Sequence, residues 1–368
     1  MTKRTVLFCV CLIGLTLTVW LGVAQGCMWF TLEARDNSVL VGRTMEFGIP
    51  LNWQVVLAPR NMEFHSQAPN GKPGISWKNK YGYVGYYGAG PEGAVADGMN
   101  EAGLTIGALW FEPNTKYQEV NPGEESRSLN LALMGPWILG NFANVDEVKH
   151  EVRNVLIYGD IIKELGMVPP LHIAVSDATG KTIVLEFEKG NLNIYDSPLG
   201  ILTNAPNFPW HMTNLRQYIG MSASNRKDGV LNILKLVPTG HGEGMIGVPG
   251  DMTPPSRFVR LAIVVKSAER QDDVEKNLNL AQHIINSFDI SKGLVVERNS
   301  EGRITAAETT QFALFKDLTN KIIYQRTYEN LNVTKIDLNK INFDGKKFKY
   351  IPLNPVPQKY LDITDQAK

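Results

Sequence analysis

Apolar and polar positions alternate along two long parts of the chain, and a period of two residues predicts β-strands there. In the first part the strand patterns cover residues 27–33, 39–46, 53–58, 81–88 and 93–111, the last of which folds back at 100–103. In the second part they cover 171–176, 182–188 and 191–195, and strand patterns return between 304 and 342. We therefore expect antiparallel strands joined by short turns.

Helical spacing of apolar residues separates these groups of strands. It predicts helices at 130–140, 145–156, 210–219, 229–237, 257–268 and 272–287, with a break at Pro136 and with Ser256 as an N-cap. Helix pairs placed between blocks of strands, without regular strand and helix alternation, favour an α+β sandwich in one domain. The first two strands form a predicted hairpin that turns at 35–37 and places Cys27 at one end of a sheet.

The first 26 residues have the three parts of a secretory signal peptide. Lys3 and Arg4 are followed by an uncharged apolar run from 6 to 23, and the small residues Ala24 and Gly26 stand three and one positions before Cys27. We expect cleavage after residue 26, a mature domain of residues 27–368, and a periplasmic or secreted protein without stable membrane association. Two alternatives remain open: an uncleaved membrane anchor, because the apolar run is nearly long enough to span a bilayer, and a lipoprotein signal that acylates Cys27.

Cys27 would be the first residue of the mature chain and its one thiol. The sequence has three cysteines, and the other two, Cys9 and Cys11, lie in the leader. A cysteine at a new N-terminus carries both a nucleophile and a free α-amine, whose ordinary pKa values of about 8.5 and about 7.7 are close together. The pattern predicts a self-contained centre for amide hydrolysis, whereas a buried structural thiol is the alternative.

Composition and charge narrow the function classes. The chain has 37 basic and 37 acidic residues, so nothing indicates nucleic-acid binding. None of its six histidines stands in a catalytic signature, and no spacing typical of metal ligands or of a phosphate-binding loop occurs. We expect no cofactor and no metal. A hydrolase that uses one of the histidines stays a rival interpretation.

Several runs, taken in order, resemble the choloylglycine hydrolase family, which contains penicillin V acylases and conjugated bile salt hydrolases. They are Cys27, GRTME at 42–46, DGMNEAGL at 97–104, LTNAP at 202–206, TNL at 213–215, Gly250 and SRFVR at 256–260. The similarity extends from Cys27 to about residue 265 and more weakly beyond. It implies the four-layer αββα sandwich of N-terminal-nucleophile hydrolases.

The resemblance also implies roles for five residues. Cys27 would attack the amide carbonyl and form a thioester, while Arg43 would lower the pKa of the thiol. Glu46 stands where the family typically has an aspartate that binds the α-amine, which is a departure by one methylene group. The Asn204 side chain would stabilise the oxyanion, and Arg257 would lie near the catalytic centre.

The backbone N–H of Trp110 would be the second oxyanion donor, and aromatic residues would line the substrate pocket: Trp29, Trp110 and Phe111. The implied partner is a small-molecule amide, with a homotetramer as the expected assembly. The export signal and Trp110 favour a penicillin V acylase-like enzyme. The alternatives are a hydrolase of bile salts or of acyl-homoserine lactone amides, and a non-catalytic, lipid-anchored periplasmic protein.

Overall fold

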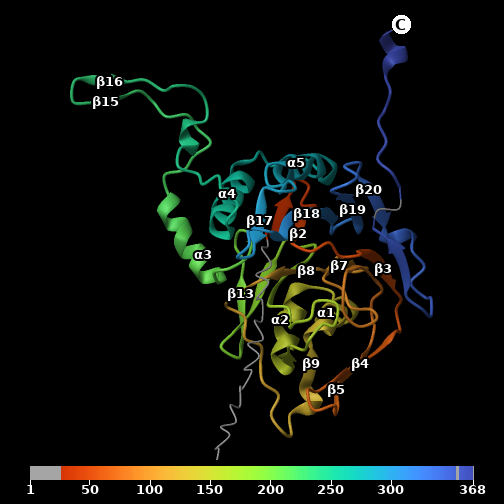
Figure 1. Ribbon diagram of the computed structural model, residues 1–368. Helices are drawn as coiled ribbons and strands as arrows, with labels where there is room; N and C mark the ends of the chain where they lie inside the picture. The colour runs from red at the N-terminus through yellow and green to blue at the C-terminus, as the bar shows by residue number, and fades with distance from the viewer. Residues whose placement is uncertain (1–25, 354–355, 368) are drawn as a thin grey trace, which may run out of the picture.

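Two stacked β-sheets, each covered by helices on its outer face, form the body of the protein. The structure is a computed structural model that describes residues 26–353 and 356–367. Figure 1 shows α4 (Pro254–Ser267) and α5 (Val274–Asn286) above one sheet, and α1 (Met134–Asn141) and α2 (Val145–Glu151) below the other. The four layers confirm the αββα sandwich expected from the sequence.

The first sheet holds the N-terminal hairpin at its centre. Its seven strands run in the order β14 (Ile201–Leu202), β1 (Met28–Glu33), β2 (Val39–Phe47), β18 (Ile304–Asp317), β19 (Ile322–Thr327) and β20 (Thr334–Asp337), and β17 (Val295–Arg298) also pairs with β18. All nine residues of β2 are buried, because helices cover one face of the sheet and the second sheet covers the other. Residues on both faces of β2 are therefore enclosed.

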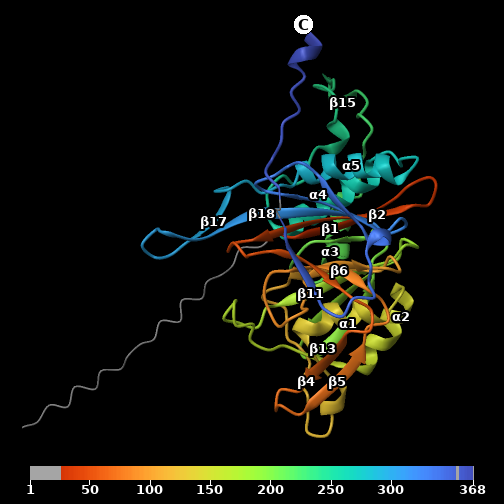
Figure 2. The ribbon, with the colours of Figure 1, turned by 90° about the vertical axis from the view of Figure 1, so that its right-hand side faces the viewer.

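The second sheet has eight strands, in the order β13 (Asn191–Asp196), β12 (Thr182–Glu188), β11 (Leu171–Ser176), β8 (Thr105–Trp110), β7 (Asp97–Asn100), β6 (Tyr83–Tyr87), β3 (Gln54–Ala58) and β21 (Lys349–Pro352). Three small two-stranded sheets pair β4 (Glu63–Gln67) with β5 (Pro73–Lys78), β9 (Ser128–Asn130) with β10 (Leu156–Tyr158), and β15 (Gly229–Leu231) with β16 (Leu234–Leu236). Figure 2 shows the two large sheets from the side, with β1, β2 and β18 in the upper one.

The first hairpin positions the start of β1. Asn37 adopts a left-handed conformation with φ 66°, which asparagine tolerates, and Asp36 accepts hydrogen bonds from the backbone and hydroxyl of Ser38. The turn fixes an antiparallel register in which Trp29 lies opposite Arg43 and Met28 opposite Thr44. The predicted hairpin is thus confirmed, and it brings Arg43 and Glu46 next to Cys27.

Some sequence-based expectations were wrong. Residues 229–237 form the hairpin of β15 and β16 rather than a helix. Pro136 does not break a helix, because it lies in the first turn of α1, where a missing N–H costs no hydrogen bond. Ser256 lies inside α4, which begins at Pro254 after Thr253, and a short helix, α3 (Phe208–Asn214), replaces the longer one expected at 210–219.

The expected signal peptide, and with it Cys9 and Cys11, lies outside the described residues apart from Gly26. Among the helices that the structure does describe, none is both long enough and apolar enough to span a bilayer.

Candidate active site

Cys27 lies just before β1, between the two sheets, and the residue is only 3% exposed. The thiol donates a weak hydrogen bond to the backbone oxygen of Glu46, at an S···O distance of 3.5 Å. Burial raises the pKa of the thiol to about 11, while the Arg43 guanidinium opposes this rise. In a chain in which Gly26 is still attached, desolvation of the thiol therefore outweighs the neighbouring cation. The expected match between the pKa values of the thiol and the α-amine concerns the cleaved chain and stays a prediction.

Arg43 reaches from β2 across to the second sheet. Its Nη2 donates to the backbone oxygen of Ala108 at 2.7 Å, and its Nε lies 3.2 Å from Oδ2 of Asp97. The second oxygen of Asp97 accepts from Nζ of Lys316 at 2.7 Å. All three charged side chains are completely buried. Two cations therefore share one carboxylate behind the thiol.

Glu46 projects from β2 toward α4, and its carboxylate is almost completely buried. The Thr310 hydroxyl donates to Oε1 at 2.7 Å, and the Thr44 hydroxyl donates to Oε2 at 2.8 Å. Burial raises the pKa of Glu46 to about 8, although the positive charge of Arg257 opposes this. In the described structure, Glu46 is thus a buried carboxyl group held by two hydroxyl groups.

Arg257, from the first turns of α4, connects the start of β1 with Asn204. Its Nη1 donates to the backbone oxygen of Gly26 and, at 2.9 Å, to that of Cys27. Its Nη2 donates to Oδ1 of Asn204 at 2.7 Å, and its Nε donates to the backbone oxygen of Met252 at 3.0 Å. Since Arg257 holds the carbonyl of Asn204, the amide group of Asn204 must point away from the guanidinium.

That amide group meets the end of β8. Nδ2 of Asn204 donates to the backbone oxygen of Trp110 at 2.9 Å and keeps a second N–H. Backbone N–H groups alternate in direction along a strand. Because Phe111 donates to Pro170 on the β11 side and Ala108 donates to Ala96 on the other side, the N–H of Trp110 points to the same edge as that of Ala108. The side-chain amide of Asn204 and the backbone N–H of Trp110 are therefore two donors at the same edge of β8, the one that faces β7.

A cavity of about 100 Å³ opens onto Cys27, and its walls are mostly apolar. Trp110 lines it, as expected, together with Met45, Phe47, Leu51, Trp53, Ala108, Ile162, Leu165 and Leu171. The expected contributions of Trp29 and Phe111 are wrong. The Trp29 ring packs between the sheets, 4.2 Å from Nζ of Lys316, and Phe111 points to the opposite side from Trp110, where it stacks on His172 at 4.6 Å.

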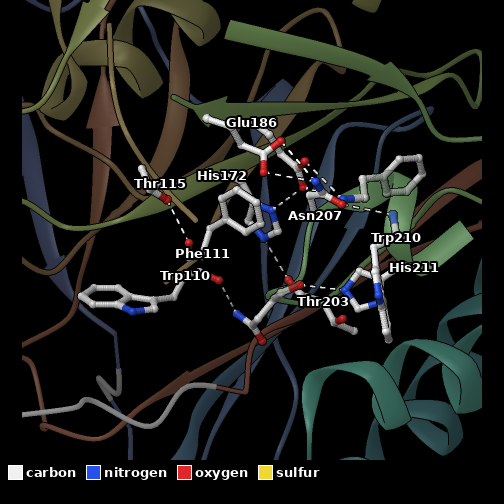
Figure 3. Close-up of polar contacts among 12 residues, drawn as sticks. Trp110, Phe111, Thr115, His172, Glu186, Thr203, Asn207, Trp210 and His211 are labelled. Carbon is white, nitrogen blue, oxygen red and sulfur yellow. Dashed lines mark hydrogen bonds and ion pairs between the residues drawn. The ribbon is translucent and has the colours of Figure 1, made fainter. Parts of the chain in front are cut away.

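Two buried histidines hold the backbone that carries Asn204, and sequence reasoning did not select either of them. Nε2 of His172 lies 3.0 Å from the oxygen of Thr203, and its Nδ1 lies 3.2 Å from Glu186. Nε2 of His211 lies 2.9 Å from the oxygen of Asn204. Figure 3 shows both rings facing the backbone around Thr203, with Phe111 beside His172. Both histidines contact backbone oxygens here, rather than the thiol.

Sequence reasoning also missed Asp97, Lys316 and Glu308. Asp97 begins one of the runs that carry the family resemblance, so that run could have indicated it. Lys316 and Glu308 stand in an ordinary strand pattern of β18, and nothing in the sequence connects them with Cys27. In the described parts of the chain, no group of three or more histidine, cysteine, aspartate or glutamate side chains could hold a metal ion.

Comparisons with known proteins show a similar fold and sequence along most of the chain. A conjugated bile acid hydrolase variant from Clostridium perfringens has a crystal structure similar to this chain, with a TM-score of 0.79 and 32% identity over 92% of this chain and 100% of the other. The structure of a penicillin V acylase from Agrobacterium tumefaciens has a TM-score of 0.70 at 22% identity, covering 89% and 91% of the two chains. The second likeness shows the shared fold alone.

Sequence similarity extends along nearly the whole chain. A bile salt hydrolase/transferase from Clostridium perfringens is 34% identical over 338 residues, which cover 89% of this chain and 97% of the relative. A penicillin V acylase from Pectobacterium atrosepticum matches at a lower identity, 22% over 350 residues. Residues 27–350 match the family model of linear amide C-N hydrolases, choloylglycine hydrolase family. The chain belongs to the choloylglycine hydrolase family of linear amide C-N hydrolases.

Proposed function

We propose that this protein hydrolyses the amide bond of small molecules with an apolar acyl group, with Cys27 as an N-terminal nucleophile. The observation that supports this most is the link from Arg257 to both the Cys27 backbone and the Asn204 side chain. The Asn204 amide in turn donates to the backbone of Trp110, which lines an apolar cavity together with Cys27. In this proposal the leader is removed after residue 26, and the new α-amine of Cys27 becomes the base.

The proposed reaction has two stages. First, the thiol gives its proton to the α-amine, and Sγ attacks the substrate carbonyl carbon. The oxyanion accepts hydrogen bonds from the Asn204 amide and the Trp110 backbone N–H. The C–N bond then breaks as the α-ammonium group protonates the leaving amine, which leaves a thioester. Second, water attacks the thioester, the α-amine takes its proton, and the acid and the thiol are released.

Removal of Gly26 would activate the thiol in this scheme. Cleavage replaces a neutral peptide nitrogen with an amine that is positively charged when protonated, directly beside a thiol whose pKa burial raises to about 11. A neighbouring cation favours the thiolate. Arg43 supplies a second positive charge on the same side, and its Nη1 has no hydrogen-bond partner among the described residues.

For the acyl group we propose conjugated bile acids ahead of penicillin V. The residues that line the cavity are mostly apolar. Two relatives that share about a third of their residues with this chain are named for bile salts or bile acids. The test is a comparison of taurine-conjugated bile acids, penicillin V and acyl-homoserine lactones with one preparation of the chain that begins at Cys27. Higher kcat/KM on penicillin V would overturn this ranking.

The nucleophile is tested by Cys27→Ser. The variant should fold as the wild type does and lose at least 100-fold in kcat on every amide of that panel, because a neutral serine hydroxyl ionises far less readily than a thiol. An exposed residue gives the matched control, since Ser224→Ala removes a hydroxyl far from the cavity and should leave kcat unchanged. Wild-type turnover by Cys27→Ser would refute the mechanism.

We also propose export with cleavage before Cys27, on the basis of the leader pattern. Intact mass and N-terminal sequencing of protein made with its leader distinguish the possibilities. A free N-terminal cysteine supports the proposal, whereas a diacylglyceryl adduct identifies a lipid-anchored protein. A chain that keeps residues 1–26 would contradict cleavage.

Finally, we propose a homo-oligomer, with a tetramer as the expected size. The β15–β16 hairpin extends from the body, as Figure 1 shows, and it exposes the apolar side chains Val230, Leu231, Ile233, Leu234, Leu236 and Val237. An apolar arm of this kind is typical of an interaction surface. Light scattering should show a smaller species for Ile233→Glu than for the wild type, and a monomeric wild type would overturn the proposal.

A further inference from the structure

A second buried carboxylate lies beside the junction of Gly26 and Cys27, and the mechanism above does not use it. Glu308, on β18, is 3% exposed. Its Oε1 lies 2.8 Å from the point that a Cβ atom on Gly26 would occupy, so the carboxylate packs directly against the residue before Cys27. This oxygen has no hydrogen-bond partner in the parts of the chain that the structure describes. A buried acceptor without a donor is costly, so a donor is expected when the site is complete.

The two carboxylates near Cys27 differ in what they already bind. Both oxygens of Glu46 receive a hydrogen bond from a threonine hydroxyl, those of Thr310 and Thr44. Oε1 of Glu308 receives none. Of the two carboxylates, Glu308 is therefore the one with an oxygen that lacks any donor, and a new donor at the end of the chain would satisfy that oxygen.

The two carboxylates near the junction of Gly26 and Cys27, those of Glu46 and Glu308, have more negative charge than the one cation that faces both of them can balance. Arg257 is the cation that both carboxylates face, yet its hydrogen bonds go to backbone oxygens and to Asn204 rather than to either of them. Burial raises the pKa of Glu308 to about 7, and Glu297 on the neighbouring strand adds to this, whereas Arg257 opposes it. One cation thus faces two carboxylates.

We propose that Glu308 is a positioning residue that binds the α-ammonium group of Cys27 once the chain begins at that residue. The inference rests on the proposed function, in which Gly26 is removed. Cleavage takes away the residue against which the carboxylate packs and creates N–H donors at the same place. Held there, the amine stays next to Sγ, the atom whose proton it has to accept. Glu46, on the other hand, would be fixed by its two threonines and would shape the site through its charge.

The test uses the chain that starts at Cys27, released from a cleavable fusion, so that its N-terminus is set independently of any leader. This chain keeps every described helix and strand, since the first of them begins at Met28. Competitive labelling with acetic anhydride from pH 5 to 10, read by mass spectrometry of the N-terminal peptide, gives the pKa of the α-amine. Wild type, Glu308→Gln and Glu46→Gln are compared.

Glu308→Gln should lower the α-amine pKa by about one unit, because a carboxylate within hydrogen-bond distance stabilises the ammonium form. Glu46→Gln should lower it by less. The matched control is Glu301→Gln, which removes one carboxylate from the exposed turn between β17 and β18, where Glu301 pairs with Arg303. This control should leave the α-amine pKa unchanged.

Activity supplies a second readout. In the plot of kcat against pH, the rise on the acid side should move to lower pH in Glu308→Gln. At its best pH this variant should have a kcat at least tenfold lower than the wild type, with KM little changed. Glu308→Asp should recover part of this loss. A purely structural role would lower the amount of folded enzyme without moving the limb.

An unchanged α-amine pKa in folded Glu308→Gln would overturn the proposal, as would a larger shift in Glu46→Gln. If Glu308→Gln does not fold, Glu308→Asp decides, because its shorter side chain withdraws the carboxylate and should lower the α-amine pKa by a smaller amount. If the wild type hydrolyses no amide, the proposed function fails, whereas the amine titration still tests Glu308.

Discussion

Replacing Asp97 by asparagine should leave two buried cations without the carboxylate that pairs with both of them. Asp97 is completely buried and contacts Arg43 and Lys316 with its two oxygens, at 3.2 Å and 2.7 Å. Asparagine has nearly the same shape but no charge. Arg43 would keep its hydrogen bond to the Ala108 backbone, and Lys316 would keep one to the Ile106 backbone at 3.2 Å. Neither cation would keep the carboxylate that compensates its burial.

The expected loss is set by the removal of one partner from a buried ion pair, which costs about 3–5 kcal/mol. For a chain of this length, about 2 °C of melting temperature are lost per kcal/mol, so the melting temperature should fall by about 6–10 °C. Activity should fall as well, because Arg43 would no longer be fixed next to the thiol. Asp344→Asn is the control: its ion pair with Arg60 is 72% exposed on the aspartate side, so the loss there should stay below about 1 kcal/mol.

The protonation of Lys316 makes the effect of Asp97→Asn on stability depend on pH. Burial lowers the pKa of Lys316 to about 8, against 10.5 in the unfolded chain. The folded state therefore loses this proton first, and the contribution of Lys316 to wild-type stability rises as the pH increases from about 8 to about 10.5. Without Asp97, the pKa of Lys316 falls further.

Asp97→Asn should consequently be less destabilising at pH 9.5 than at pH 7. At pH 9.5 Lys316 is mostly neutral in the folded state, so Arg43 alone is a buried cation without its carboxylate. Urea unfolding at both pH values measures this difference, and Asp97→Asn combined with Lys316→Met should be more stable at pH 7 than Asp97→Asn alone. A loss below 1 kcal/mol at pH 7, or a double variant no more stable than the single one, would refute the reasoning.

Three further outcomes are expected. Asn204→Ala should lower kcat about 100- to 1000-fold with little change in KM, as measured by steady-state kinetics, because it removes one of the two proposed oxyanion donors. A change in KM alone would contradict this role. In a chain that retains Gly26, the alkylation rate of Cys27 by iodoacetamide should keep rising up to about pH 11, whereas a plateau near pH 8.5 would contradict the raised pKa of the buried thiol. Trp110→Leu should change KM across the amide panel, and Phe111→Leu should change stability alone, because only Trp110 lines the cavity; equal effects of the two on KM would be the contrary result.

Local pattern was sufficient to predict the hairpin that carries Cys27 and Arg43. The turn residues, the alternation of both strands and the register all lie within about 20 residues of each other, so no distant contact was needed. The residues 229–237 show the opposite case. Their closely spaced apolar residues suggested a helix face, yet they form an exposed hairpin, because no neighbouring layer covers them and the turn at Asn232, with φ 55°, joins two strands.

The site depends on contacts that composition and spacing do not encode. Asn204 and Arg257 were selected through the family resemblance, and their direct contact emerged from the structure. Lys316 and Glu308 stand on the same strand, and each reaches a different partner, Asp97 in one case and Gly26 in the other. Buried charges are rare unless they are paired, but a sequence does not show which ones are buried.

The state of residue 26 connects these features. While Gly26 is attached, the nitrogen of Cys27 is an amide without basicity, the thiol pKa is about 11, and Glu46 and Glu308 share Arg257 as their cation. Each of these three conditions works against catalysis at neutral pH. The proposed removal of the leader, up to and including Gly26, would change all three. The new terminal amino group would be a base when it is deprotonated, and in its ammonium form a cation beside the thiol and a donor for Glu308. In this proposal, the burial that would keep the uncleaved chain inactive would also make the new charge effective, since charges act most strongly where water is excluded.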